Sequence, residues 1–155
     1  MSATLCASSA RSAAVCLCAG LAVAQGPAKE DLEKQQGTWV AVSFRRDGQD
    51  TPREIVRTIT RTVEGAHVVW KRDGKNFAGA ALVLDPGQDP KAIDVIADGG
   101  PSRGKRVLGI YKIENDKLTL CMADPDQPRP REFKAEKGSG HTLMAFARQE
   151  MRARP

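Results

Sequence analysis

The chain has 155 residues, and its 24 lysines and arginines outnumber its 19 aspartates and glutamates to give a formal net charge of +5. This length suits a single domain. Because the two signs of charge are interspersed and no groove-reading motif accompanies the excess of positive charge, we expect no nucleic-acid partner.

Residues 1–24 have the pattern of a secretory signal. Arg11 is the only charged side chain among them, a run of small apolar residues follows it, and Ala-Val-Ala ends at Ala24 as a cleavage pattern. The apolar run is too short for a permanent membrane helix. We therefore expect cleavage near Ala24, export to the periplasm or the medium, and no stable membrane insertion. Cys121 would then be the only cysteine left, which excludes an intramolecular disulfide.

After the signal, Gly37 separates a short predicted helix from a β pattern. Residues 28–36 follow a proline that favours helix starts, and Gly37 can end the helix. Residues 51–56 are compatible with one more helical turn. Turns rich in Gly, Asn, Asp and Pro then separate short apolar or alternating runs. These runs predict nine strands: Thr38–Arg46, Arg57–Val63, Ala66–Arg72, Asn76–Leu84, Ala92–Ala97, Lys105–Glu114, Lys117–Ala123, Arg131–Ala135 and Thr142–Arg148.

This order of strands predicts an all-β fold. Short sequential strands without long crossovers form an antiparallel meander, and such a sheet removes its exposed edges by closing into a barrel. A two-sheet sandwich is the alternative. The expected organisation is a signal at 1–24, an N-terminal segment with the short helix at 25–37, a small barrel of eight or nine strands at 38–149, and a basic tail at 150–155.

The hairpin at residues 109–123 can be predicted in more detail. If Asn115 and Asp116 form a two-residue turn, Tyr111 lies opposite Leu120. Side chains alternate between the two sides of a strand, so one face is the expected core face. It carries Tyr111, Ile113, Leu118, Leu120 and Met122. Cys121 lies on the other face, beside Ile110.

Five segments in order resemble one family over about Leu32 to Arg148. They are "QGTWVAVSFRRDGQ", "DPKAID", "GKRVLGIYKIENDKLTLCMA", "RPREF" and "GSGHTLMAFAR". Together they resemble a family of small exported domains, uncharacterised and abundant in planctomycete bacteria. The resemblance implies a bacterial exported β domain and brings no known activity or functional residues.

A more distant resemblance concerns architecture. Gly37-Thr38-Trp39 after a short helix is similar to the G-x-W opening of lipocalin-type barrels, in which the tryptophan closes one barrel end beneath an arginine from the last part of the chain. The resemblance implies that Arg148, at the end of the last predicted strand, covers Trp39. The first and last strands of a closed meander are neighbours, so this contact is geometrically reasonable.

No catalytic or metal-binding constellation is visible in the sequence. The two histidines, His67 and His141, show no zinc spacing with Cys121. A lone unpaired cysteine commonly packs as a small hydrophobe, which is the role we expect for Cys121. Because no acid, base and nucleophile converge, we expect no enzyme activity, no metal and no cofactor.

The leading functional hypothesis is an exported lipocalin-like barrel that binds a small apolar or amphipathic ligand. Its candidate lining residues are Trp70, Tyr111, Leu120, Met122 and Phe133. The proline-rich loop "DPDQPRPREF" ends at Phe133, and we expect it to be a rigid connector whose Phe133 plugs the core. The alternative is that Arg129, Arg131 and Glu132 of this loop form a binding rim.

The alternative function is an envelope or extracellular protein-interaction module, because small barrels are often filled by their own side chains. An interior cavity of several hundred cubic ångströms would favour the ligand-binding hypothesis. A packed interior with an exposed apolar patch would favour the interaction module.

Overall fold

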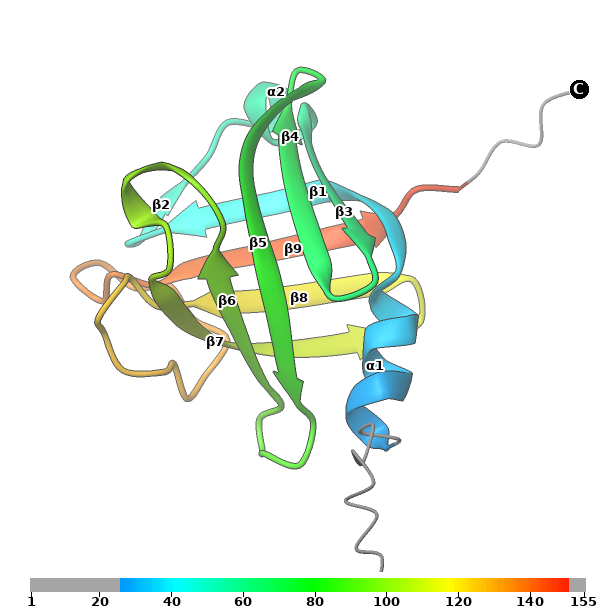
Figure 1. The fold of residues 1–155 in the computed structure, drawn as a ribbon. Coiled ribbons are helices and arrows are strands. Elements are labelled where there is room, and N and C mark those ends of the chain that lie inside the picture. The colour runs from blue at the N-terminus through cyan, green and yellow to red at the C-terminus, as the bar shows by residue number, and fades with distance from the viewer. Residues whose placement is uncertain (1–25, 151–155) are drawn as a thin grey trace, which may run out of the picture.

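Eight antiparallel strands close into a barrel, and a short ninth strand lies outside it (Figure 1). The structure, a computed structural model, describes residues 26–150, so the predicted signal 1–24 and residues 151–155 of the predicted tail lie outside the described residues. The strands are β1 (Gly37–Arg46), β2 (Gln49–Asp50), β3 (Ile59–Glu64), β4 (His67–Arg72), β5 (Lys75–Asp85), β6 (Ala92–Ala97), β7 (Arg106–Glu114), β8 (Lys117–Met122) and β9 (Thr142–Arg148).

The barrel closes because β1 pairs with both β3 and β9, whereas β2 pairs only with the end of β1. Helix α1 (Pro27–Gln35) precedes the barrel, and a single turn, α2 (Arg53–Val56), connects β2 to β3. A short 3-10 turn at Gly100–Ser102 joins β6 to β7. Among residues 26–150, no helix has the length and apolar character needed to cross a bilayer.

One of the nine predicted strands is wrong. Residues 131–135 form no strand, because β8 already pairs with β7 and β9 and leaves no free edge beside it. The segment is instead fixed by isolated hydrogen bonds: Gly48 N–H donates to the Ala135 carbonyl, and the Cys121 thiol donates to the Lys134 carbonyl. The two-residue β2 was not predicted, since Gln49 and Asp50 carry no strand pattern.

The barrel interior is mostly apolar. In the hairpin of β7 and β8, Tyr111 pairs with Leu120, Ile113 with Leu118 and Gly109 with Met122, which confirms the predicted register and core face. The core cluster extends over all eight barrel strands and includes Trp39, Ala41, Ile59, Val63, Val68, Ala80, Leu82, Ile93, Tyr111, Leu118, Leu120, Met122, Met144 and Phe146.

The segment at residues 123–141 covers the outside of β7 and β8. Arg129 fastens it: the guanidinium donates to the Gly109 carbonyl at 2.7 Å and to the Ile93 carbonyl at 3.1 Å, and pairs with Asp94 at 2.8 Å. As a result Cys121, on the outward face of β8, is fully buried. This second layer explains why the outer face of the hairpin is buried around Ile110 and Cys121.

The expectation that Phe133 plugs the core is wrong. Phe133 is only partly buried, and its ring centre lies 5.4 Å from Nζ of Lys112. Lys112 alternates with the inward-facing Tyr111, so both Lys112 and Phe133 lie outside the barrel. Arg129 holds the connector against the outer face, and Phe133 therefore never reaches the interior.

Candidate functional site

Helix α1 lies at one end of the barrel (Figure 1). Two of its polar residues, Asp31 and Gln35, are buried. Asp31 is 4% exposed and Gln35 is fully buried. These residues stand four apart and therefore share one face of the helix. Between them Leu32 packs against the core cluster. The contact between helix and barrel is thus partly apolar and partly polar.

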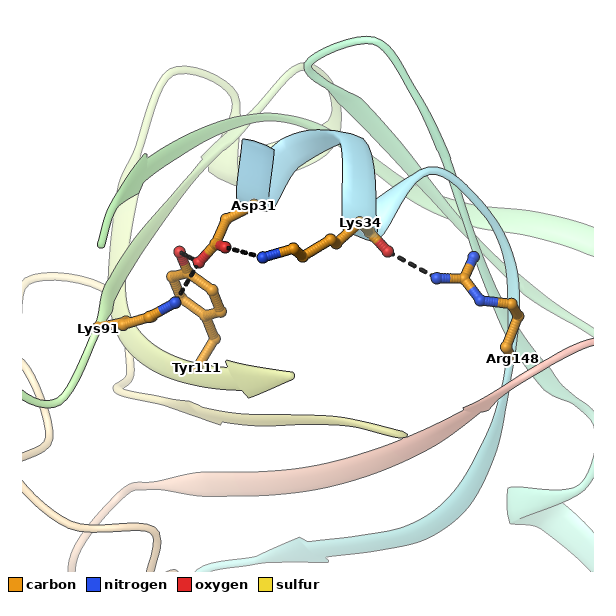
Figure 2. Close-up of polar contacts among 5 residues, drawn as sticks. All are labelled: Asp31, Lys34, Lys91, Tyr111 and Arg148. Carbon is orange, nitrogen blue, oxygen red and sulfur yellow. Dashed lines mark hydrogen bonds and ion pairs between the residues drawn. The ribbon is translucent and has the colours of Figure 1, made fainter. Parts of the chain in front are cut away.

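Asp31 ties the helix to the barrel wall. Its carboxylate accepts hydrogen bonds from the Tyr111 hydroxyl at 2.7 Å, from Lys91 at 2.7 Å and from Lys34 at 3.3 Å (Figure 2). Burial alone would raise the pKa of Asp31, but the hydrogen bonds from Lys91 and Tyr111 outweigh it and the pKa is lowered. Burial, together with the bond to Asp31, raises the pKa of Tyr111, so the phenol stays protonated as a donor.

Arg148 fastens the other end of α1. It donates to the Lys34 carbonyl at 2.7 Å, as Figure 2 shows. It also donates to the Gln36 carbonyl at 2.8 Å, and both bonds satisfy carbonyls that the helix end leaves free. The same guanidinium lies over Trp39, which is fully buried and donates from Nε1 to the Gln35 carbonyl at 2.9 Å. The contact expected between Trp39 and Arg148 is therefore present.

Arg61 is a fully buried cation inside the barrel. It shares the inward face of β3 with Ile59 and Val63. Its Nη2 donates to Oε1 of Gln35 at 2.6 Å, and within residues 26–150 this is its only hydrogen bond, since Nε and Nη1 have no partner. Burial lowers the pKa of Arg61 to about 9, which still leaves it charged at neutral pH.

The surroundings of Arg61 are aromatic. In the strand register Arg61 lies opposite Trp39 on β1 and opposite Trp70 on β4. Our sequence analysis missed Asp31, Gln35 and Arg61. For Arg61 a signal existed, because the alternation of "ITRTVE" already directs this side chain to the same face as its apolar neighbours.

Four of the five residues expected to line a cavity share the interior. Tyr111 and Leu120 are each 1% exposed, Met122 is 7% exposed, and Trp70 packs partly buried against the core cluster. Phe133 lies outside, as described above. A water-sized cavity would appear as accessible surface on the side chains around it. The low exposure of Tyr111, Leu120 and Met122 means that they pack against their neighbours, whereas Trp70 keeps an intermediate exposure.

A separate cleft lies on the outside of the barrel. It has a volume of about 590 Å³ and runs along β4, β5 and residues 97–102. His67 and Asp98 form a pair in it at 2.5 Å, and Phe77 is 58% exposed beside them. Gly79 permits the close approach of Asp98, since a Cβ there would lie 2.8 Å from the carboxylate. In the described part of the chain, no three His, Cys, Asp or Glu side chains cluster as metal ligands would.

Cys121 is poorly suited to act as a nucleophile. Its thiol is buried under residues 123–141 and donates to the Lys134 carbonyl at 3.3 Å. Burial raises the pKa of the Cys121 thiol, and the reactive thiolate is therefore disfavoured. The residue packs as a small hydrophobe between the barrel wall and the outer segment.

No protein-family model, no curated protein and no solved structure matches the chain.

Proposed function

We propose that the chain is an exported, non-enzymatic binding domain of lipocalin-like architecture that takes a small amphipathic ligand at the end of the barrel covered by α1. One observation carries the proposal: the helix that covers this end presents two buried polar side chains, Asp31 and Gln35, to the interior. A helix that served only to complete the core would present apolar side chains there.

A cover held largely by hydrogen bonds separates from a barrel more readily than one held by apolar burial. A hydrogen bond contributes about 0.5–1.5 kcal/mol net, or about 1.5–3 kcal/mol when one partner is charged, because water replaces the lost partner when the contact opens. Apolar contacts contribute about 25 cal/mol per Å² and have no such replacement. The polar side chains of Asp31 and Gln35 regain hydrogen bonds to water when α1 opens, which lowers the cost of opening.

The interior of the barrel suits an amphipathic molecule. Trp70, Tyr111, Leu120 and Met122 supply aromatic and aliphatic surface, and methionine adapts its shape readily to a new neighbour. The polar side chains of Asp31 and Gln35, at the barrel end covered by α1, suit the polar end of the ligand. Entry requires α1 to move, since the interior is packed when the helix is in place.

The absence of a catalytic role is part of the proposal. Cys121 is buried with a raised pKa, and His67 lies on the outer surface, remote from the barrel interior to which the ligand would bind. Residues 1–24 are proposed to be removed on export. The proposed kinship with exported planctomycete domains rests on the sequence segments, and the lipocalin-like assignment rests on Trp39 beneath Arg148.

Hydrogen exchange tests the opening of α1. The mature chain, freed of small molecules, is expected to exchange the α1 amides much faster than those of β8, and a lipid extract of host cells is expected to slow α1 selectively. Equal protection of α1 and β8 without extract, unchanged when the extract is added, would contradict the proposal.

A second candidate function is an interaction module that uses the outer cleft. The packed interior and the exposed ring of Phe77 favour it. It predicts that Phe77→Ala abolishes partner binding while leaving the exchange of α1 unchanged, whereas the ligand-binding proposal predicts no dependence on Phe77.

A further inference from the structure

The Arg61–Gln35 pair holds three unpaired donors. Arg61 Nε, Arg61 Nη1 and Gln35 Nε2 are buried and have no acceptor among the described residues. All three lie next to a single hydrogen bond, because Nε and Nη1 share the guanidinium carbon with Nη2, and Nε2 shares the amide carbon with the accepting Oε1. Buried polar groups in folded proteins are nearly always paired, so this cluster lacks an acceptor.

Charge decides which acceptor is missing. Arg61 is a cation, and among residues 26–150 the neutral side-chain amide of Gln35 is the only hydrogen-bond partner of its guanidinium. The carboxylate on the same face of α1, Asp31, is already occupied by Tyr111 and Lys91. A water molecule would satisfy donors but leave the charge uncompensated. A carboxylate offers about four acceptor positions on two oxygens and also neutralises the guanidinium.

We infer that Arg61, together with Gln35, is the receptor for the anionic head group of the ligand. This inference rests on the proposed function and names the chemical class of the ligand: a small amphiphile with one oxyanion, carboxylate or phosphate, and an apolar body. The head group binds Arg61 between β1 and β4, and the apolar body lies against Trp70, Leu120 and Met122. When α1 opens, the oxyanion takes the place of Gln35 Oε1 as the acceptor for Arg61 Nη2.

The position of the tryptophans provides the readout. The chain contains two tryptophans, and both lie opposite Arg61 in the strand register. Intrinsic fluorescence therefore reports on this site. The experiment uses the mature chain after removal of bound small molecules, and titrates it with decanoate, decyl phosphate, decanol and decyltrimethylammonium below their micelle concentrations.

At least one of the two anions is expected to quench or shift the tryptophan fluorescence saturably, with an affinity about tenfold or more above that of decanol. Decyltrimethylammonium, the cation, is expected to bind no more tightly than decanol. Comparison of decanoate with decyl phosphate identifies the head group. Arg61→Met should reduce anion affinity to that of decanol, whereas Arg57→Met, which removes an exposed arginine beside α2, should behave as wild type.

Stability distinguishes a receptor from a structural arginine. Removing an uncompensated buried charge should leave the ligand-free thermal midpoint of Arg61→Met equal to or above that of wild type. A strongly lowered midpoint for Arg61→Met would instead mark Arg61 as a structural residue and overturn the inference. Equal affinity of the wild type for decanoate, decyl phosphate and decanol would also overturn it. In the latter case decanol binding would still support the proposed function. Failure of all four probes would contradict both the inference and the proposed function.

Discussion

The guanidinium carbon of Arg148 lies 4.2 Å from the centre of the Trp39 ring, although the two residues belong to the last and first strands of the barrel. They are direct partners in the pairing of β1 with β9. The contact therefore joins three parts of the molecule: the seam that closes the barrel, the buried indole and the end of α1.

Removal of the indole should destabilise the fold strongly. Trp39→Ala leaves a void at the barrel closure and is expected to cost about 3–5 kcal/mol in the free energy of unfolding. Arg148→Lys retains the charge but loses the planar stacking and the paired bonds to Lys34 and Gln36, so we expect about 0.5–2 kcal/mol. Urea unfolding measures both. Equal stability of Trp39→Ala and wild type would contradict the structural account of this seam.

Acid should weaken the attachment of α1 through Asp31. The folded-state pKa of Asp31 is lowered, so its contribution to stability is present above the usual aspartate value of about 3.9 and is lost as pH falls through the lower folded value. The stability difference between wild type and Asp31→Asn should therefore be largest near neutral pH and shrink below about pH 4.

Asp50→Asn, which changes an exposed carboxylate, provides the matched control for this effect. Urea unfolding of the three proteins at several pH values makes the comparison. A difference between wild type and Asp31→Asn that grows toward acid would contradict the assigned sign.

Cys121 should be inert. Cys121→Ser keeps a donor for the Lys134 carbonyl and is expected to cost at most about 1–2 kcal/mol, with ligand binding unchanged. The native thiol should also resist alkylation near neutral pH, because it is buried and its pKa is raised. Labelling as fast as that of the unfolded chain, or loss of binding without loss of structure, would show that the thiol is functional.

Apolar side chains inside and outside the barrel should differ in their contribution to the free energy of unfolding. Leu120→Ala, in the barrel core, is expected to cost about 2–5 kcal/mol. Phe133→Ala, on the outside of the barrel beside Lys112, should cost about 1 kcal/mol or less. Comparable losses for the two variants in chemical denaturation would place Phe133 in the core after all.

The parts of the fold that were predictable follow from local pattern. Alternation gave the inward face of β7 and β8, and the Asn115-Asp116 turn set their register. The position of Phe133 was not predictable, because it depends on Arg129 binding the Gly109 and Ile93 carbonyls on distant strands. A proline-rich run contains no information about which face of a barrel it will cover.

The candidate site was only partly predictable for a similar reason. Trp70, Tyr111, Leu120 and Met122 could be assigned to the interior from alternation alone. That Arg61 has no counterion within the described part of the chain is a property of the assembled barrel, since it depends on the partners of Asp31 and Gln35. Strand pattern places the side chain inside but does not reveal what it binds there.

The central claim is that the barrel holds an anionic amphiphile beneath α1, and native mass spectrometry of the protein isolated from its own host tests it most directly. The account predicts that a fraction of the wild-type protein carries one small molecule. Organic extraction should release this molecule, and its mass should identify it as an anion with an apolar body. Arg61→Met prepared in the same way should lack that mass. A wild-type protein of the bare polypeptide mass under conditions that preserve the fold, or an equal bound mass on Arg61→Met, would contradict the account.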